Sequence, residues 1–303
     1  MSLTAATRGS RLALIQVDIV STLLGKLDPS ASVETRIVET AGDLDRERPI
    51  VELDQKGVFT RAVDDLVMRG EADFSVHSMK DLPMELPQGL IIAAVPERAS
   101  PYEALVSVEY GSLDELPTGA VVGTSSPRRT AQLKHLRDDL EIRLIRGNVD
   151  TRLRKLEEGQ YDALILAEAG LIRLDRGDAI KERLSLEEFT PPAGQGALAI
   201  VVREDDSETL QALGAITHRP SLAEVDAERS FMEAMGGGCS TPIGVLARLD
   251  DEMTLYASVL SPDGKERFQF NKSGEAVNPR AFGRSAALEA LELGAAKIVE
   301  KWG

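Results

Sequence analysis

The sequence predicts an α/β fold with two doubly wound lobes and a small α+β C-terminal domain. Apolar residues switch repeatedly between helical spacing and strand alternation along the first two thirds of the chain. Ser100-Pro101 and Pro191-Pro192 mark two crossovers between the lobes, and the pattern changes beyond Pro220. We therefore expect domain 1 to comprise residues 1–98 with 196–217, domain 2 residues 101–192, and domain 3 residues 221–303.

Composition excludes several classes of protein. The chain has 303 residues, of which 43% are hydrophobic and 28% charged, which is typical of a globular protein rather than a disordered one. Its net charge of −15 argues against nucleic acid or an anionic membrane surface as a partner. No apolar run approaches the roughly 20 residues of a membrane-spanning helix. An anionic ligand would therefore need a local basic cleft.

In the first lobe, a polar motif follows a strand. Apolar positions at helical spacing predict a helix over Val58–Met68, and alternation predicts a strand over Ala72–Val76. Lys80 and Asp81 lie just beyond that strand, before Pro83, where open α/β sheets usually bind ligands. They could form a simple surface pair. Alternatively, Asp81 could stabilise a developing cation or move protons.

The second lobe repeats the alternation of strands and helices. We expect, in order, strand Ala120–Gly123, helix Arg128–Leu136, strand Glu141–Ile145, helix Val149–Leu156 and strand Ala163–Ala167. After Gly194-Gln195-Gly196, the apolar run Ala197–Val202 could be a strand that returns to the first lobe. A chain that crosses twice in this way makes a hinged cleft.

The segment Gly123–Arg129 has the composition of an anion-binding helix start. Hydroxyl groups and backbone N–H groups precede a proline in the first helical turn, and two arginines follow. An ordinary serine cap with solvated arginines is the alternative. More guanidinium groups follow at Arg143, Arg146, Arg152 and Arg154. Several arginines at one edge of a sheet in an acidic protein favour a polyanionic ligand.

The third domain begins with a helix over about Leu222–Met235. Strand-like runs start at Val245 and Met253, and Pro262-Asp263-Gly264 predicts a hairpin turn. A final helix is expected to carry one apolar stripe, made by Leu288, Leu291, Ala295 and Ile298.

The single cysteine, Cys239, follows three glycines in a sterically open loop. Such a loop would let a bulky group reach the sulfur, although a structural cysteine is the alternative. One thiol cannot form an internal disulfide, which fits a reducing cytoplasm. The three scattered histidines lack ligand spacing, so we expect no metal site. The N-terminal apolar stretch is interrupted by Arg8 and Arg11, so we expect no signal peptide there.

Together these residues resemble the porphobilinogen deaminase family of tetrapyrrole biosynthesis, also called hydroxymethylbilane synthases. The resemblance runs from Thr7-Arg8-Gly9-Ser10 to Leu249 and is weaker in the C-terminal domain. It is carried by His77-Ser78-Met79-Lys80-Asp81-Leu82-Pro83, Gly123–Arg129, Arg146-Gly147-Asn148-Val149 with Arg152, Pro192-Ala193-Gly194-Gln195-Gly196-Ala197, and Gly237-Gly238-Cys239 with Pro242-Ile243-Gly244. The resemblance implies lobes similar to the type II periplasmic-binding-protein fold.

The resemblance also implies a chemistry. A dipyrromethane cofactor would be attached through a thioether to Cys239, and four porphobilinogen molecules would be joined head to tail with loss of ammonia to give hydroxymethylbilane. Asp81 would be the catalytic aspartate. The implied cofactor-binding residues, besides Cys239, are Lys80, Thr124, Ser126, Arg128, Arg129, Arg146 and Gly147. The implied substrate-binding residues are Arg8, Ser10, Lys56, Arg152, Arg173 and Gln195, with Lys56 in a mobile lid at about residues 41–57.

The family expectation is a cytoplasmic monomer that takes porphobilinogen as substrate. A transient hand-over of the product to uroporphyrinogen-III synthase is also expected. Two other functions compete with this interpretation. A solute-binding protein would bind a carboxylate ligand without turnover, and a cysteine acyltransferase or hydrolase would form a thioester that hydroxylamine cleaves.

Overall fold

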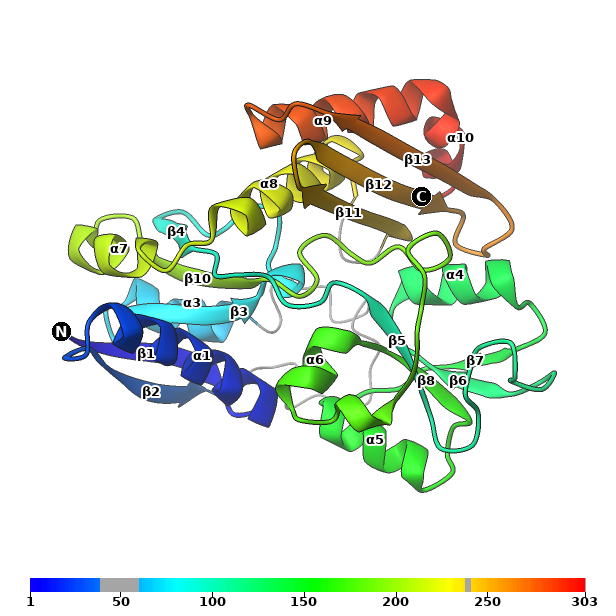
Figure 1. Ribbon diagram of the computed structural model, residues 1–303, viewed down its shortest axis with the longest axis horizontal. Helices are drawn as coiled ribbons and strands as arrows, with labels where there is room; N and C mark the ends of the chain where they lie inside the picture. Colours follow the sequence, from blue (N-terminus) through cyan, green and yellow to red (C-terminus); the bar gives the residue numbers. More distant parts are fainter. Residues whose placement is uncertain (39–59, 238–240, 303) are drawn as a thin grey trace. The chain divides into compact units, whose positions relative to one another are not determined.

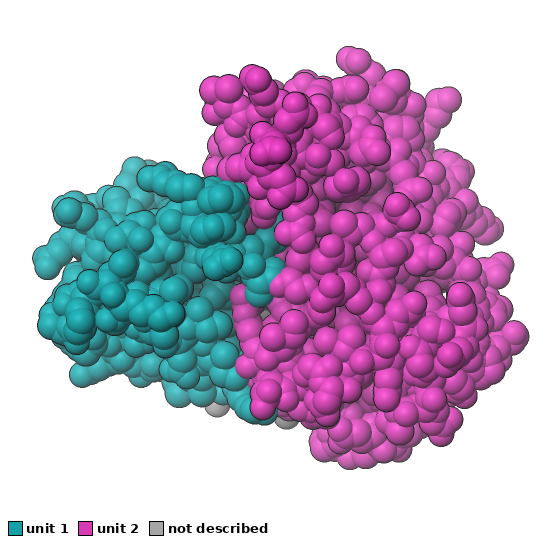
Figure 2. Space-filling view, in the orientation of Figure 1, with its two compact units in different colours: residues 1–99, 197–222 teal, residues 100–196, 223–303 magenta. Residues whose placement is uncertain are grey.

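The computed structural model describes residues 1–38, 60–237 and 241–302, which form two compact units. Unit 1 contains residues 1–99 and 197–222, and unit 2 contains residues 100–196 and 223–303 (Figure 2). The chain thus enters unit 2 and returns to unit 1 through the strand Leu198–Arg203. Lys56 and Cys239 lie outside the described residues.

Unit 1 is built on a five-stranded sheet of order β2-β1-β3-β10-β4 (Figure 1). Strand β1 pairs in parallel with β2 and with the central strand β3, whereas β10 runs antiparallel between β3 and β4. The elements are β1 (Ser2–Arg8), α1 (Arg11–Leu27), β2 (Ser32–Val38), α3 (Arg61–Met68), β3 (Phe74–Ser78), the 3-10 turn η2 (Met79–Asp81), β4 (Leu90–Ala94), β10 (Leu198–Arg203) and α7 (Ser207–Gly214).

The two faces of this sheet have different partners. Phe74 and Val76 of β3 belong to an apolar core shared with α1 and α7. Because side chains alternate along a strand, Ser75 and His77 point to the opposite face, where both contact Asp64 of α3. A polar cluster therefore lies between β3 and α3.

Unit 2 contains a second five-stranded sheet, of order β7-β6-β8-β5-β9. Leu133 of α4 packs on one face of this sheet, and Leu153 of α5 and Leu171 of α6 belong to the core on the other. The elements are β5 (Glu103–Ser107), β6 (Val121–Gly123), α4 (Pro127–Leu136), β7 (Glu141–Arg143), α5 (Val149–Glu157), β8 (Ala163–Ala167), α6 (Glu168–Arg173), η3 (Gly177–Ala179) and β9 (Ile180–Arg183).

Unit 2 also contains a three-stranded antiparallel sheet of order β11-β12-β13, with helix α9 and the part of α8 from Ala223 onward. A Cβ atom on Gly283 of α9 would lie 2.0 Å from the carbonyl oxygen of Ala227 in α8, so these helices pack closely. The elements are α8 (Arg219–Ala234), β11 (Ile243–Leu249), β12 (Met253–Leu260), β13 (Arg267–Gly274), α9 (Pro279–Ala290), the π-helical turn η4 (Leu291–Ala295), α10 (Ala296–Val299) and η5 (Glu300–Trp302).

The predicted fold class is confirmed, since two α/β sheets and a small antiparallel sheet with helices are present. The division into three domains with the stated boundaries stays a prediction, because the antiparallel sheet lies in the same compact unit as the second α/β sheet. Within the described residues, no helix is long and apolar enough to cross a membrane.

Several expected elements differ from the structure in their bounds, and the final helix also differs in its packing. Strand β7 ends at Arg143 rather than Ile145, beyond which Gly147 adopts φ +114°. The predicted final apolar stripe is wrong at its start, because Leu288 is 49% exposed. Gly294, with φ +136°, interrupts the helical backbone between Leu288 and the buried Ile298, so the two residues do not share one continuous helix face.

Candidate active site

The predicted site residues lie beyond strand ends at the switch point of each α/β sheet. In unit 1, β1 is followed in sequence by β2 on one side and then by β3 on the other. In unit 2, β6 is likewise flanked by β7 and β8. Ligands of open α/β sheets bind where the strand order reverses in this way. The carboxyl ends of β1 and β3, and those of β6, β7 and β8, are therefore the candidate regions.

In unit 1, a pocket brings together three of the predicted residues. Arg8 lies at the end of β1, Ser10 caps α1, and Asp81 ends the turn η2 after β3. Ser10 accepts a hydrogen bond from the Ala13 backbone N–H at 3.3 Å. The pocket is lined by Thr7, Arg8, Ser10, Leu12, Ala13, Gln16, Thr60, Val63, Val76, His77, Ser78 and Asp81. It combines an exposed carboxylate with an arginine, hydroxyl groups and an imidazole.

A buried polar cluster backs this pocket. Ser75 donates a hydrogen bond to Asp64 Oδ1 at 2.9 Å, and the same oxygen lies 2.7 Å from Nε2 of His77. Asp64 and His77 are both buried. Asp64 Oδ2 has no hydrogen-bond partner among the described residues. The cluster was not predicted, although Thr60, Val63, Asp64 and Val67 share one helical face, which places Asp64 on the buried side of α3.

In unit 2, α4 begins as the sequence predicts. Pro127 occupies the first helical turn, and Ser126 accepts a hydrogen bond from the Arg129 backbone N–H. Thr124 donates its backbone N–H to the Arg143 carbonyl at 3.0 Å, which ties the end of β6 to the end of β7. Both strand ends therefore present their side chains at the same edge of the sheet.

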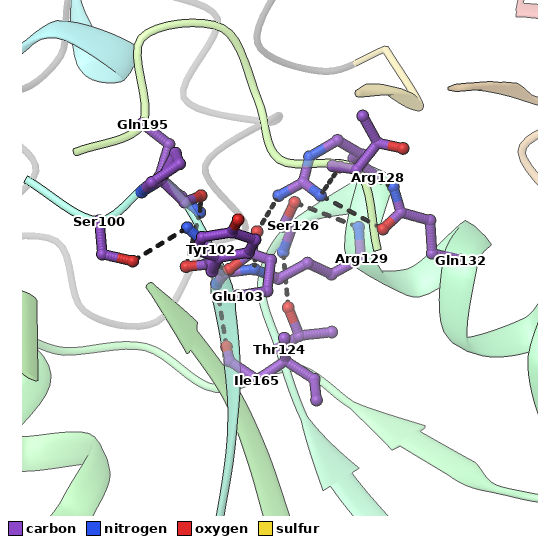
Figure 3. A network of polar contacts seen from close by, with 12 residues as sticks. Ser100, Tyr102, Glu103, Thr124, Ser126, Arg128, Arg129, Gln132, Ile165 and Gln195 are labelled. Atoms are coloured by element: carbon purple, nitrogen blue, oxygen red, sulfur yellow. Dashed lines mark hydrogen bonds and ion pairs between the residues drawn. The ribbon is translucent and has the colours of Figure 1, made fainter. Parts of the chain in front are cut away.

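The two arginines of α4 are held by a buried glutamate (Figure 3). Glu103, at the start of β5, is fully buried and receives hydrogen bonds from both Arg128 and Arg129. Arg128 also donates to the Thr190 carbonyl at 2.7 Å, and Arg129 to the Ile165 carbonyl at 2.9 Å. Much of their hydrogen-bonding capacity is therefore used within the protein.

Burial dominates the electrostatics of this cluster. Desolvation lowers the pKa of Arg128 to about 10, although the attraction of Glu103 opposes this shift. Repulsion by Arg129 adds to the lowering. Both guanidinium groups are charged at neutral pH, so the cluster has two positive charges and one carboxylate. The sequence analysis did not predict a role for Glu103. The feature that could have indicated a buried charge is the position of Glu103 directly before the apolar run Ala104–Val106.

Arg146 differs from the α4 arginines, which pair with Glu103, because it forms no ion pair with the residues that the structure describes. It is buried, and its Nη1 makes no hydrogen bond among the described residues. The next residue, Gly147, has φ +114° and accepts a hydrogen bond from Arg152 Nε at 2.8 Å. Asn148 then caps α5. This turn therefore presents an unsatisfied buried cation beside an anchored one.

Arg173 ends α6 and is largely buried. Its Nη2 donates to the Gly196 carbonyl at 2.8 Å, and desolvation lowers its pKa to about 10. Gln195 is fully buried and donates its side-chain amide to the Pro101 carbonyl at 2.8 Å. In the structure, Gln195 therefore ties the loop before β10 to the start of β5.

The structure thus groups the predicted residues within each unit. Unit 1 holds Arg8, Ser10, Lys80 and Asp81, and unit 2 holds Thr124, Ser126, Arg128, Arg129, Arg146, Gly147, Arg152, Arg173 and Gln195. Their roles in binding and catalysis stay predictions, as do those of Lys56 and Cys239. Within the described residues, no group of three or more His, Cys, Asp or Glu side chains is placed to hold a metal ion.

Two family models match the chain. "Porphobilinogen deaminase, dipyromethane cofactor binding domain" matches residues 3–211, and "Porphobilinogen deaminase, C-terminal domain" matches residues 222–292. Together the matched segments contain nearly all of the described residues.

Curated relatives match over almost the full length. The porphobilinogen deaminase of Desulforudis audaxviator is 45% identical over 97% of this chain and 96% of its own. That of Pelotomaculum thermopropionicum is 44% identical over 97% and 95%. Among solved structures, a Salmonella typhimurium periplasmic binding protein of high arginine specificity matches with TM-score 0.41 and 14% identity, over 73% of this chain and 93% of its own.

Proposed function

The chain belongs to the porphobilinogen deaminase family, and we propose that its reaction takes place at the Asp81 pocket of unit 1. The chain is a transferase that joins four porphobilinogen molecules head to tail, with loss of ammonia, on a dipyrromethane primer. The finer assignment is to the hydroxymethylbilane synthase reaction, with release of the linear tetrapyrrole by water.

The cofactor-binding domain spans both α/β sheets, so their cationic side chains are the candidates for holding dipyrromethane. Each pyrrole carries an acetate and a propionate group, so the cofactor is a polyanion. A buried guanidinium with an orphaned Nη1, as in Arg146, fits an anionic group, because a carboxylate would satisfy that donor. When bound, the cofactor supplies the pyrrole α-carbon to which the first substrate is joined.

We assign the cofactor carboxylates to the residues at the ends of β6 and β7 in unit 2. Arg146 would donate from its orphaned Nη1. The hydroxyl groups of Thr124 and Ser126 lie at the start of α4, where the helix dipole favours negative charge. Arg128 and Arg129 would contribute the net positive charge that remains after pairing with Glu103. Lys80, Gly147 and a thioether on Cys239 complete the proposed set.

Substrate carboxylates are assigned to a second group of side chains. Arg8 and Ser10 line the Asp81 pocket. Arg173 is largely buried, and this burial disfavours the charged form of its guanidinium group. A carboxylate beside Arg173 would offset that desolvation. Arg152, Gln195 and Lys56 are the remaining proposed contacts. Because every added pyrrole brings two carboxylates, the demand for cations grows as the product lengthens.

Asp81 is proposed as the catalytic carboxylate. Loss of ammonia from an aminomethylpyrrole leaves an electron-poor pyrrole, and its capture by a second pyrrole develops positive charge on nitrogen. A fixed carboxylate at that position stabilises the charge and accepts a hydrogen bond from the pyrrole N–H. Asp81 is held by the turn η2, whose C-cap residue, Leu82, donates its backbone N–H to the Met79 carbonyl.

We further propose that the protein acts as a monomer in the cytoplasm. Its unstable linear product would pass to uroporphyrinogen-III synthase in a transient hand-over. Sedimentation tests the monomer, and the lifetime of the linear product with and without that enzyme tests the hand-over. A stable dimer, or no change in product lifetime when the second enzyme is added, would contradict them.

The observation that carries the proposed function is the pocket that joins Asp81 to Arg8 and Ser10 at the β1–β3 switch point. The test is the intact mass of the purified chain, with a peptide map around Cys239 before and after hydroxylamine treatment. We expect an excess of about two pyrrole units on Cys239 that survives hydroxylamine, and its loss in Cys239→Ser.

Other outcomes distinguish the competing functions. A mass excess removed by hydroxylamine would indicate a thioester and thus an acyltransferase. An unmodified chain that stays unmodified after incubation with porphobilinogen or preformed hydroxymethylbilane would contradict the cofactor assignment. Binding without turnover of porphobilinogen would then favour a solute-binding protein.

A further inference from the structure

The cluster of Asp64, Ser75 and His77 contains a buried charge that the proposed function does not use. Asp64 Oδ1 receives a hydrogen bond from Ser75 and lies 2.7 Å from Nε2 of His77, while Oδ2 has no partner among the described residues. A buried carboxylate with an orphaned oxygen is costly unless a positive charge is available beside it. The neighbouring group that can supply this charge is the imidazole of His77.

The hydrogen bonds also orient the ring. Because an ionised carboxylate only accepts hydrogen bonds, Nε2–H of His77 donates to Asp64, and Ser75 Oγ lies 3.0 Å from the same nitrogen. The neutral ring then has its bare lone pair on Nδ1. Nδ1 has no hydrogen-bond partner among the described residues, and His77 lines the same pocket as Asp81. His77 therefore brings to the lining of this pocket an imidazole ring whose lone pair is on Nδ1.

We propose that His77 is the proton acceptor of the Asp81 pocket and that Asp64 and Ser75 are its positioning residues. This inference rests on the proposed function, because it supplies the base that the condensation requires. Imidazole changes charge between about pH 5 and 8, which suits a base that must take up and release a proton in each cycle. The neighbouring Asp64 carboxylate would stabilise the imidazolium that forms.

The proton balance of the reaction gives His77 its role. When two porphobilinogen molecules are joined, the C–N bond of one aminomethyl group breaks, and its electron pair leaves with nitrogen as ammonia. A C–C bond forms between that methylene carbon and the α-carbon of the second pyrrole, whose C–H bond then releases a proton. An ammonium substrate thus yields one ammonia and one proton per new bond. Nδ1 of His77 accepts this proton and passes it to water or ammonia.

Other groups near His77 also bear on its protonation. Asp64 approaches from α3, and the β10 residue opposite His77 is the apolar Ala199. The polar and charged residues on the pocket side, contributed by β1, α1, the residue before α3, β3 and η2, are Thr7, Arg8, Ser10, Gln16, Thr60, Ser78 and Asp81. Lys80 lies beside Asp81 on η2. Arg8 and Asp81 are the charged groups of this lining, and their charges are opposite in sign.

The first test is the pH dependence of kcat and KM in the holoenzyme. His77→Asn is expected to lower kcat about 100-fold and to remove the decline of kcat at acid pH that His77 causes. Asp64→Asn is also expected to lower kcat, because the ring loses the acceptor that fixes its tautomer and orientation. KM changes little in both variants. The exposed His135, in His135→Gln, is the matched control and keeps the wild-type profile.

The second test does not depend on turnover. The chain has three histidines, so ring-nitrogen NMR of protein labelled with 15N-histidine gives three assignable signals. His77 is assigned as the signal that remains in both His135→Gln and His218→Gln. We expect the neutral His77 ring to be protonated on Nε2 in the wild type and to lose this preference in Asp64→Asn.

A ring protonated on Nδ1 in the wild type would overturn the proposal, as would a wild-type kcat and pH profile in His77→Asn. If a variant at His77 does not fold, two other measurements decide: the tautomer in the wild type and the kcat of Ser75→Ala. We expect Ser75→Ala to lower kcat, because Asp64 and the ring lose a positioning contact, and a wild-type kcat counts against the proposal. If only the role of His77 is wrong, the intact mass still shows the cofactor on Cys239. If the proposed function is wrong, the intact mass shows no cofactor.

Discussion

The end of β3 in unit 1 and the start of α4 in unit 2 both carry charged residues at a switch point, but they use their charges differently. Asp81 is exposed in a pocket, and the orphaned oxygen of Asp64 lies behind it. In unit 2 the corresponding carboxylate, Glu103, is fully buried between Arg128 and Arg129. Unit 1 leaves the Asp81 carboxylate exposed, whereas unit 2 uses a carboxylate to hold its arginines in place.

The comparison extends to the arginines themselves. Arg128 and Arg129 have carboxylate and carbonyl acceptors, but the buried Nη1 of Arg146 has none within the described part of the chain. A cluster of arginines in a sequence therefore contains members with different tasks. Those paired inside the fold stabilise it and set the net charge, and those left unsatisfied are available to an anionic ligand.

The largest effect is expected at Asp81. Asp81→Asn removes the negative charge but keeps the shape, so turnover of porphobilinogen falls at least about 100-fold while cofactor remains attached. Steady-state kinetics and intact mass measure the two quantities. The exposed Asp65 on α3 provides the control, since Asp65→Asn should keep wild-type turnover. Near-normal turnover of Asp81→Asn would refute the assigned role.

Glu103→Gln should affect stability rather than chemistry. Removing one partner of a buried ion pair leaves two uncompensated guanidinium groups, which typically costs about 3–5 kcal/mol. Urea unfolding should show a lower midpoint with little change in slope, and Glu109→Gln, at an exposed site in the same unit, should not. A neutral effect would mean that the arginines do not depend on Glu103.

Arg173→Gln should weaken substrate binding. A charge-assisted hydrogen bond contributes about 1.5–3 kcal/mol, so we expect KM for porphobilinogen to rise roughly 10- to 100-fold. Arg154→Gln serves as the control, because Arg154 is exposed and pairs with Glu158 on the surface of α5. An unchanged KM in Arg173→Gln would exclude a carboxylate contact there.

The smallest effect is a pH dependence away from the site. Hydrogen bonds from Arg137 lower the pKa of Asp139 from 3.8 to about 2. Because the folded pKa lies below the unfolded value, the pair stabilises the fold above about pH 3.8 and loses this contribution as the pH falls through about 2. Asp139→Asn should therefore melt slightly below the wild type at pH 7, and the difference should vanish near pH 2. A difference that persists at pH 2 would contradict the assignment.

Much of the fold could be predicted because local patterns coincide with tertiary packing. β8 has the expected bounds, and α5 starts at the expected residue after its Asn148 cap. The final helix could not be predicted as it is, since the apolar spacing of Leu288 and Ile298 does not reveal that Gly294 takes a positive φ. The antiparallel placement of β10 between β3 and β4 likewise depends on strand pairing, which periodicity does not specify.

The site was predictable where motifs place side chains at strand ends. Asp81, Ser126 and the α4 arginines lie where the sequence indicates. The charged partners of these site residues could not be predicted, because they come from distant parts of the chain. Glu103 is more than 20 residues from Arg128, and Asp64 meets His77 only because α3 packs against one face of β3.

The most direct test of the central claim follows substrate units on the protein. Holoenzyme and its Asp81→Asn variant, each mixed with a few equivalents of porphobilinogen, are compared by intact mass after rapid quenching. The Asp81 assignment predicts added pyrrole units on the wild type and only the original cofactor mass on the variant. A variant that gains pyrrole units as fast as the wild type would contradict the assignment of the chemistry to Asp81.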